Sequence, residues 1–177
     1  MIEKDQIFPY DTTPVFKVLN TGNGQIRDIY QYDQNIFDYN GFDMWGEKFS
    51  IVLRDDALHK ESLFCLDIST GENREIYKTD SDVLDITLTE QSMWGDRIVW
   101  SSNFNNGKDK IFYYDLMTEN VYDTGIYGRR ATIYNDTLVY ENEGRTYYTN
   151  IPEPATAGLM GLGLAGLLAS SRKRKSA

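Results

Sequence analysis

The sequence of 177 residues has little of the chemistry that staples small domains or builds common catalytic centres. Cys65 is the only cysteine, which excludes an internal disulfide, and we expect it to be a buried strand residue. Because His59 is the only histidine, a zinc ion would lack its usual ligands. The sequence also has no Gly-x-Ser-x-Gly motif and no glycine-rich phosphate loop. These absences predict a protein that is not an enzyme.

Positive charge is also scarce, with 18 Lys and Arg against 27 Asp and Glu. Because four of the cations lie at 172–175, residues 1–151 hold 14 basic and 26 acidic residues and carry a formal charge of −12. Phosphate backbones require a basic footprint, so nucleic acid is excluded as a partner. An acidic polysaccharide is disfavoured as well, unless divalent cations bridge it to the protein.

What the chain does have is aromatic residues in a repeated strand pattern. Its 13 tyrosines favour strands over helices. Tyr30–Asp33, Phe64–Asp67 and Phe112–Asp115 align as an apolar strand closed by aspartate. Met44-Trp45-Gly46 and Met93-Trp94-Gly95 open new apolar stretches 49 residues apart. The spacings of 34 and 48 residues between the closing aspartates lie around the ~40–50 residues of four-stranded propeller blades. The pattern predicts an all-β repeat domain.

The third repeat shows the unit most clearly. It runs from Trp94-Gly95-Asp96-Arg97 through an Asn106-Gly107 hairpin signal to Asp115. This pattern resembles the TolB-like β-propeller repeats of bacterial envelope proteins over about residues 15–149. The resemblance implies a partial β-propeller-like array of antiparallel blades, with Trp45 and Trp94 stacked between blades. About three to four blades are few for a ring of typically 4–8, and a β-sandwich is the alternative fold.

The C-terminus carries the other informative pattern, fifteen uncharged residues at 155–169 followed by a basic cluster. The cluster is Arg172, Lys173, Arg174 and Lys175. The run is short for a membrane span, but with the two serines after it we expect one short transmembrane helix at about 155–171. The positive-inside bias then leaves the basic cluster in the cytoplasm and residues 1–151 on the far side. An ordinary C-terminal core helix is the alternative.

Pro152-Glu153-Pro154 precedes this run, and the three parts have a familiar order. The segment 151–177 resembles the PEP-CTERM sorting signal of Gram-negative bacteria. The resemblance implies processing near Pro152, Glu153 and Pro154 by exosortase, a membrane-embedded cysteine protease. It also implies a precursor in the inner membrane with a cytoplasmic C-terminus, and a domain, residues 1–150, that is at the cell surface or secreted after processing.

The N-terminus departs from this pattern. Residues 1–11 have acidic side chains where a signal peptide has a basic region, and no apolar stretch of sufficient length follows. We expect the true start to lie upstream, with a signal peptide and further blades, so that the repeat domain is N-terminally truncated. Loss of the leader from the gene is the alternative.

These features predict a non-enzymatic binding or structural module of the cell surface or extracellular matrix. Extracellular polysaccharide or a surface protein is the expected ligand class. Because an aromatic ring offers an apolar face, eight tyrosines are candidates for a sugar-stacking platform, although packing between blades explains tyrosines on strands equally well. They are Tyr113, Tyr114, Tyr122, Tyr127, Tyr134, Tyr140, Tyr147 and Tyr148.

Two other functions remain open at this point. A polysaccharide hydrolase or lyase on a propeller scaffold is one, because paired carboxylates are recognised by their separation in space. A non-functional gene fragment is the other. No cofactor is expected, with calcium as the one ion that the acidic turns leave open. These turns lie at 55–56, 80–82, 109 and 141–143, and none has the ligand spacing of an EF-hand loop.

Overall fold

The computed structural model describes residues 15–20, 24–31, 36–55 and 58–151, and over these ranges the protein is all-β. Fourteen strands form four antiparallel sheets that follow one another in chain order. Within these ranges, no helix is long and apolar enough to cross a membrane. The transmembrane helix expected at about 155–171 lies outside them.

We refer to the four sheets as blades 1 to 4. Blade 1 contains β1 (Val15–Asn20) and β2 (Gln25–Gln31). Blade 2 contains β3 (Ile36–Trp45), β4 (Lys48–Asp55), β5 (Lys60–Asp67) and β6 (Asn73–Lys78). Blade 3 contains β7 (Val83–Thr87), β8 (Met93–Trp94), β9 (Arg97–Phe104), β10 (Asp109–Asp115) and β11 (Asn120–Tyr127). Blade 4 contains β12 (Arg129–Tyr134), β13 (Thr137–Asn142) and β14 (Arg145–Asn150).

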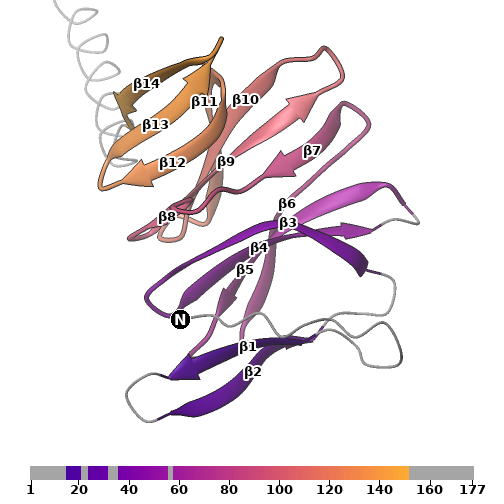
Figure 1. Cartoon of the computed structure of the whole chain (residues 1–177), viewed down its shortest axis with the longest axis vertical. Coiled ribbons are helices and arrows are strands. Elements are labelled where there is room, and N and C mark those ends of the chain that lie inside the picture. The colour runs from indigo at the N-terminus through magenta and orange to yellow at the C-terminus, as the bar shows by residue number, and fades with distance from the viewer. Residues whose placement is uncertain (1–14, 21–23, 32–35, 56–57, 152–177) are drawn as a thin grey trace, which may run out of the picture.

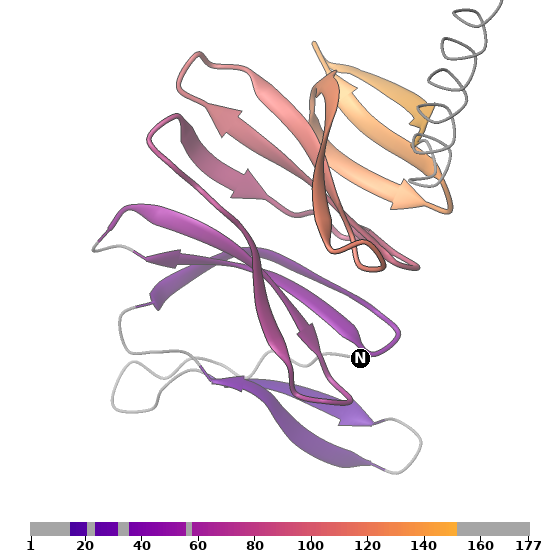
Figure 2. The same ribbon diagram turned by 180° about the vertical axis from the view of Figure 1, so that it is seen from behind.

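The blades are arranged as a fan, with β1 and β2 at one end and β12 to β14 at the other (Figure 1), and the same order is seen from behind (Figure 2). Within blades 2 and 4, each strand pairs with the strand that follows it in the chain. In blade 3, β7 and β8 both pair with β9 and so share the place of a first strand. This arrangement confirms the expected array of antiparallel blades, and the described residues do not form a sandwich of two facing sheets.

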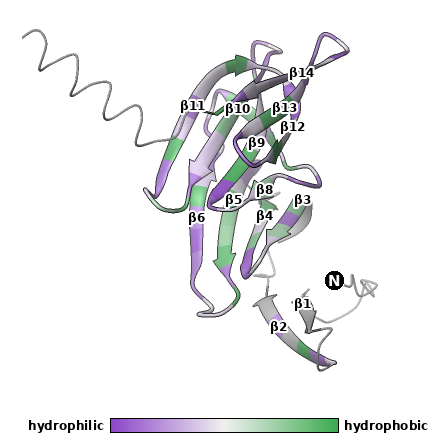
Figure 3. Ribbon diagram, turned by 90° about the vertical axis from the view of Figure 1, so that its left-hand side faces the viewer, coloured by the Kyte–Doolittle hydropathy of each residue, from purple (hydrophilic) through white to green (hydrophobic). Residues whose placement is uncertain are grey.

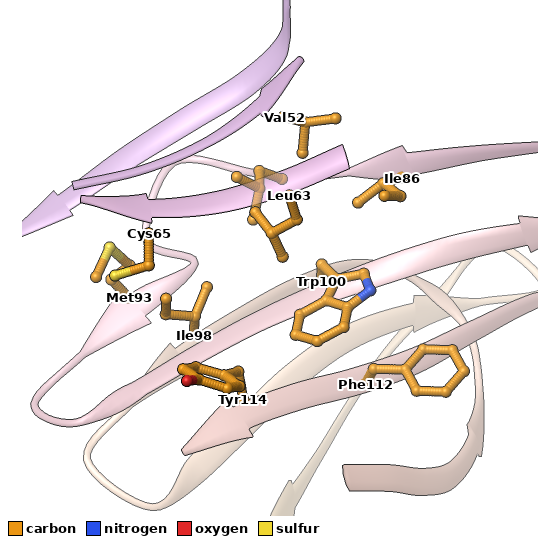
Figure 4. Close-up of a cluster of buried hydrophobic side chains, with 10 residues drawn as sticks. Val52, Leu63, Cys65, Ile86, Met93, Ile98, Trp100, Phe112 and Tyr114 are labelled. Carbon is orange, nitrogen blue, oxygen red and sulfur yellow. The ribbon is translucent and has the colours of Figure 1, made fainter. Parts of the chain in front are cut away.

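Hydrophobic side chains fill the spaces between consecutive blades. Val52 and Leu63 of blade 2 lie opposite Trp100 of blade 3 (Figure 4). Because side chains alternate along a strand, Trp100 faces blade 2 whereas its neighbour Val99 packs against blade 4. Figure 3 shows the result as hydrophobic stretches within β5 and β9 and hydrophilic residues along β6 and in the turns. The inner strands are therefore apolar on both faces.

One backbone hydrogen bond recurs in blades 2, 3 and 4. The residue after the third strand donates its N–H to a carbonyl in the turn between the first two strands. The three bonds join Ile68 to Glu47 (2.7 Å), Leu116 to Asp96 (2.8 Å) and Ile151 to Asp136 (2.7 Å). This recurrence confirms that the repeats are copies of one unit, and that blade 4 keeps the geometry of the unit up to Ile151.

The aspartate that closes the third strand has a structural role. Asp67 Oδ1 accepts hydrogen bonds from the backbone N–H groups of Ser69 (2.8 Å) and Thr70 (3.2 Å). Asp115 Oδ1 accepts the equivalent bonds from the residues two and three positions after it. Lys48 Nζ lies 2.6 Å from Asp67 Oδ2 and lowers the pKa of that carboxyl. Each aspartate thus organises the turn that follows it.

The expectation that Tyr30–Asp33 matches Phe64–Asp67 is wrong. Tyr30 lies in β2, which is the second strand of the β1–β2 hairpin, whereas Phe64 lies in β5. β1 and β2 correspond to β5 and β6, with Asn20 at the position of Asp67, 47 residues later. The spacing of 34 residues between Asp33 and Asp67 was therefore measured from an aspartate after a fourth strand to an aspartate after a third strand. The error arose because aspartates follow both kinds of strand, since both lead into turns.

Polar contacts also connect neighbouring blades. Asp43 Oδ2 in blade 2 accepts a hydrogen bond from the Met93 N–H in blade 3 (2.7 Å), and burial raises the pKa of Asp43. Arg97 of blade 3 donates to Asp136 Oδ1 of blade 4 (2.5 Å). Each of these contacts lies beside the turn between the first two strands, so the blades are aligned at this end of the fan.

Ser101 on β9 supplies a test of the packing between blades 3 and 4. Its side chain is 3% exposed, and its hydroxyl has no hydrogen-bond partner among the described residues. An unpaired buried hydroxyl opposes folding, so we expect Ser101→Ala to raise the free energy of unfolding by about 1 kcal/mol. Urea unfolding of the full chain in detergent solution measures this change.

Ser92 is the matched control for this substitution. It is also buried, but its hydroxyl accepts a hydrogen bond from the Thr89 N–H (2.7 Å) and donates to the Thr89 carbonyl (2.8 Å). Ser92→Ala should therefore lower the free energy of unfolding by about 1–2 kcal/mol. Changes of the same sign in both variants would contradict the assignment.

Candidate functional site

The expected sorting motif begins directly after the last described residue. Ile151 is buried in the core between blades 3 and 4, so the folded blade extends to the residue before the motif. In blades 2 and 3, the equivalent residues Ile68 and Leu116 lead into a turn and a fourth strand. Among the described residues blade 4 has three strands, and the motif stands where a fourth strand would begin.

The motif residues and the basic cluster themselves lie outside the described residues. They are Pro152, Glu153, Pro154, Arg172, Lys173, Arg174 and Lys175. Their roles in processing and membrane orientation therefore stay predictions. The structure shows where the folded domain ends. Ile151 is buried, and Pro152 follows it directly in the sequence, so no linker separates the domain from the motif.

No group of three or more His, Cys, Asp or Glu side chains is placed to hold a metal ion in the part of the chain that the structure describes. The acidic turns use their carboxylates locally. Asp55 Oδ1 accepts a hydrogen bond from the Leu58 N–H (3.0 Å), and Asp80 Oδ1 accepts one from the Asp82 N–H (2.8 Å). Such bonds are typical of Asx turns. Calcium binding stays a prediction without a described site.

Cys65 and His59 are too far apart to form a catalytic pair. Cys65 lies on β5, whereas His59 is exposed in the turn before β5, with a φ of 50°. Six residues of extended chain separate them by about 20 Å. Cys65 instead packs with Val52 and Leu63, and burial raises the pKa of its thiol to about 11. The expectation of a buried strand cysteine is confirmed.

The buried thiol gives a chemical test of this packing. Because the thiolate is the reacting species, a pKa of about 11 should make alkylation of Cys65 by iodoacetamide at pH 8 about a hundredfold slower than that of an exposed thiol. The rate is measured by intact mass, with the chain unfolded in concentrated urea as the reference. Equal rates in folded and unfolded chain would show that Cys65 is accessible.

A groove with a volume of about 480 Å³ lies between blades 3 and 4. Its walls are the β9–β10 turn, the β11–β12 connection and the β13–β14 turn. The side chains that line it are mostly charged, and one is aromatic. They include Lys108, Asp109, Tyr127, Arg129, Glu141 and Glu143. This composition suits a polar ligand more than an apolar one.

Ion pairs already organise the charges of this groove. Glu141 accepts hydrogen bonds from Arg129 (3.0 Å) and Arg130 (3.4 Å), and the bond from Arg129 lowers the pKa of Glu141. A carboxyl held ionised in this way is poorly suited to act as a general acid. Lys108 Nζ lies 5.2 Å from the centroid of the Tyr127 ring. The groove thus has the character of a binding surface.

A hydrolase would need two carboxyl groups close together in space, and Asp85 and Asp109 are neighbours of this kind, on either side of β9. Both pair in register with Asn103 of β9, and the Asn103 side chain donates to Asp109 Oδ1 (2.7 Å). Burial raises the pKa of Asp85, and the charge of Asp109 raises it further. Asp109 lines the groove, but Asp85 is not among its lining residues.

A smaller pocket of about 140 Å³ lies between blades 2 and 3. Arg74 crosses it and pairs with Glu72 (3.0 Å) and Glu119 (2.7 Å), and these bonds raise the pKa of the guanidinium. Lys48 and Asp67 form a second pair in the same pocket. Of these pairs, Arg74–Glu119 joins the two blades, whereas Arg74–Glu72 and Lys48–Asp67 lie within blade 2.

The structure divides the eight candidate tyrosines into two groups. Four pack between or within blades, namely Tyr113, Tyr114, Tyr122 and Tyr140. Four are exposed, namely Tyr127 in the groove and Tyr134, Tyr147 and Tyr148 in blade 4. The sequence could not separate these groups, because all eight lie in similar strand contexts.

Trp45, Trp94 and Tyr134 occupy equivalent positions in blades 2, 3 and 4 and form a row of rings. The ring centroids of Trp45 and Trp94 lie 4.0 Å apart, and those of Trp94 and Tyr134 lie 4.2 Å apart. The expectation that Trp45 and Trp94 stack between blades is confirmed. The row continues to Tyr134, whose contact with Trp94 was not predicted from the sequence.

Comparison with protein-family models identifies a PEP-CTERM protein-sorting motif at residues 150–175. The chain therefore carries this sorting signal, as expected from Pro152-Glu153-Pro154 and the segments after it. The match begins at Asn150, the last residue of β14, so signal and domain adjoin. A search of curated proteins finds no match.

Solved β-propellers are similar to the described fold. TolB from Acinetobacter baumannii matches with a TM-score of 0.53 and 14% identity, over 78% of this chain and 36% of TolB. The β-propeller domain of the Trilobed protease from Pyrococcus furiosus matches with a TM-score of 0.55 and 12% identity, over 80% and 47%. A protein from Listeria monocytogenes matches with a TM-score of 0.53 and 11% identity, over 88% and 52%.

These likenesses establish the class of fold. The four blades are of the β-propeller type, and TolB-like propellers are among their structural neighbours. The chain spans about a third to a half of the length of these three proteins. At these identities the likeness concerns the fold alone.

Proposed function

We propose that the protein is an exported module that exosortase sorts and that binds an extracellular polymer without transforming it. In the precursor, a helix at about 155–171 holds the chain in the inner membrane, and the basic cluster 172–175 keeps the C-terminus in the cytoplasm. Processing near Pro152-Glu153-Pro154 places the blades at the cell surface or releases them. The observation that carries the proposal is the junction at Ile151, where the last buried residue of the domain meets the sorting motif.

The junction supports sorting for a physical reason. Because no linker separates blade 4 from the motif, the domain sits against the membrane surface until the chain is cut. The basic cluster favours a single orientation, since each cation costs about 2.5–3.5 kcal/mol to place at the centre of a bilayer. Retention and release would then both depend on residues after Ile151, and the blades would need no part in either.

Binding without catalysis is supported by the surfaces of blades 3 and 4. The groove between them has charges already paired, an aromatic ring and no side chain that the described contacts activate as a nucleophile. Exposed tyrosines on blade 4 add apolar area with polar tips. The expected ligand class is an extracellular polysaccharide or a surface protein.

The intact mass of the native protein tests the proposal. It is measured on protein recovered from the membrane, external and cytoplasmic fractions of the source cell. A membrane form that keeps the basic cluster, together with an external form that ends near Pro154, is the expected result. A single form confined to the cytoplasm, with its C-terminus intact, would contradict export.

A polysaccharide hydrolase remains the second candidate, and the observation that favours it is the Asp85–Asp109 pair. A carboxyl whose pKa is raised beside a second carboxyl group is an arrangement that glycoside hydrolases use. If purified protein cleaves a polysaccharide and Asp85→Asn abolishes the cleavage while binding persists, the non-enzymatic part of the proposal is wrong.

A further inference from the structure

The face of blade 4 that points away from blade 3 is built differently from the corresponding face of blade 3. On blade 3, Ser101 and Ile111 are paired across β9 and β10, and both are buried on the side of blade 4. The equivalent pair on blade 4 is Glu141 and Thr146, across β13 and β14. Burying a carboxylate under a further blade would be costly. The two faces therefore differ in charge at equivalent positions.

Two tyrosines stand on this outward face. Tyr148 pairs with Val139, and Tyr134 pairs with Thr137, in rows on either side of the row that contains Leu138. Leu138 is fully buried toward blade 3, so the rows beside it point outward. The exposed fractions of Tyr134 and Tyr148 are 62% and 81%. By contrast, Tyr113, which occupies the position of Tyr148 in blade 3, is buried.

The two rings stand on the outer strands of a three-stranded sheet, β12 and β14, with β13 between them. Tyr134 and Tyr148 lie two strands and two residues apart in the sheet, which corresponds to about 12 Å between their Cα atoms. The Tyr134 ring rests on Trp94 at a centroid distance of 4.2 Å, so one side of the ring is supported while the rest is open to solvent. Such a ring loses little conformational freedom when a ligand stacks on it.

The other side chains of this face are small and polar. Thr132, Thr137 and Asn150 offer hydroxyl and amide groups between and beside the tyrosines, and Val139 is the only aliphatic residue in the two outward rows. A protein interface would have a larger apolar centre. Alternation of aromatic faces with hydrogen-bonding groups instead matches the surface of a sugar chain, which has apolar C–H faces and a rim of hydroxyls.

Charge narrows the class of sugar chain. The two rows that carry the tyrosines contain no charged side chain. Glu141 lies at the edge where this face meets the groove, and it pairs there with Arg129 at 3.0 Å and Arg130 at 3.4 Å. The chain as a whole is acidic, with a net charge of −9, which disfavours a polymer that carries uronic acids or sulfates. A neutral polymer therefore fits the face better than an anionic one.

We infer that the outward face of blade 4, defined by Thr132, Tyr134, Thr137, Tyr148 and Asn150, binds a neutral polysaccharide by stacking sugar rings on its two tyrosines. The inference rests on the proposed function and adds to it the site and the ligand class. The face lies on the blade that ends at the sorting motif, so the bound polymer would lie beside the processed C-terminus of the protein.

Affinity gel electrophoresis of the full-length chain in detergent tests the inference. The native gels contain hydroxyethyl cellulose, arabinoxylan or dextran as neutral probes and polygalacturonate as an anionic probe. We expect retardation by at least one neutral polymer and none by polygalacturonate. Tyr148→Ala and Tyr134→Ala should each weaken that binding about tenfold, since a lost stacking ring contributes on the order of 1.4 kcal/mol. Tyr148→Trp, which keeps an aromatic face, should bind like the wild type.

Tyr147→Ala is the matched control, because Tyr147 lies on the same strand but on the opposite face, where its ring lies 5.6 Å from that of Tyr140. It should bind like the wild type. Because Tyr148 is the most exposed of these tyrosines, its substitution should leave folding intact even if Tyr134→Ala does not.

Several outcomes would overturn the inference. They are no retardation by any neutral probe, binding to polygalacturonate alone, equal losses in Tyr147→Ala and Tyr148→Ala, or self-association of the chain that Tyr148→Ala abolishes, which would make a second copy the occupant. Each of these leaves export and processing untouched, since the mass measurement reports on them separately. A processed external form whose Tyr148→Ala variant binds normally would refute the platform while the proposed function stands.

Discussion

Trp100→Ala is expected to destabilise the domain by about 3–5 kcal/mol, the largest loss that we anticipate from a single substitution. Trp100 is fully buried in the core between blades 2 and 3, and its ring lies 5.2 Å from that of Tyr77 and 5.9 Å from that of Phe112. Alanine would leave a cavity at this position, because a close-packed core relaxes only in part around a deleted side chain. In a chain of this size the loss corresponds to a fall in Tm of roughly 6–20 °C.

Two variants make this measurement specific. Trp100→Phe should cost much less than Trp100→Ala, because it keeps most of the buried area and removes an indole N–H that has no partner among the described residues. Trp45→Ala removes the same side chain from a position that is 39% exposed, so its cost should also be smaller. Thermal unfolding of the full chain in detergent reports all three. Equal losses at Trp45 and Trp100 would contradict the core described here.

The blades could be predicted from the sequence because their signals are local. The Asn106-Gly107 hairpin, the alternation of apolar residues and the Trp-Gly pairs each depend on a few neighbouring residues, and the structure places them as expected. The register of the first repeat was wrong for the same reason. Asp67 organises a turn after a third strand, while Asp80 organises one after a fourth, and a short pattern that ends in aspartate does not distinguish them.

The candidate surfaces could not be predicted, because they depend on which face of a strand meets another blade. Tyr113 and Tyr148 follow similar residues, but Tyr113 is buried between blades 3 and 4 and Tyr148 is exposed on blade 4. A usable signal was present in the partner strand. Ser101 in β9 is replaced by Glu141 in β13, so the sequence already shows that the two faces differ in charge at equivalent positions.

Replacing Pro152-Glu153-Pro154 with three alanines is expected to block processing and leave insertion into the membrane intact. The substitution spares the apolar run at 155–169 and the basic cluster, so the energy that holds the segment in the bilayer is unchanged. It also spares Ile151, so blade 4 keeps its last buried residue. The expected result is accumulation of the full-length membrane form and loss of the external form, measured by intact mass and by immunoblot of cell fractions.

The matched variant changes Arg172, Lys173, Arg174 and Lys175 to serine and leaves the motif unchanged. It should weaken retention and orientation, because the cations that oppose translocation of the C-terminus are gone. The two variants therefore separate recognition from anchoring: the first keeps the chain uncut in the membrane, and the second lets it leave the membrane or insert in either direction. Normal release of the triple-alanine variant would show that the cut does not depend on the motif. Unchanged fractionation and topology of the serine variant would show that the apolar run alone sets the orientation.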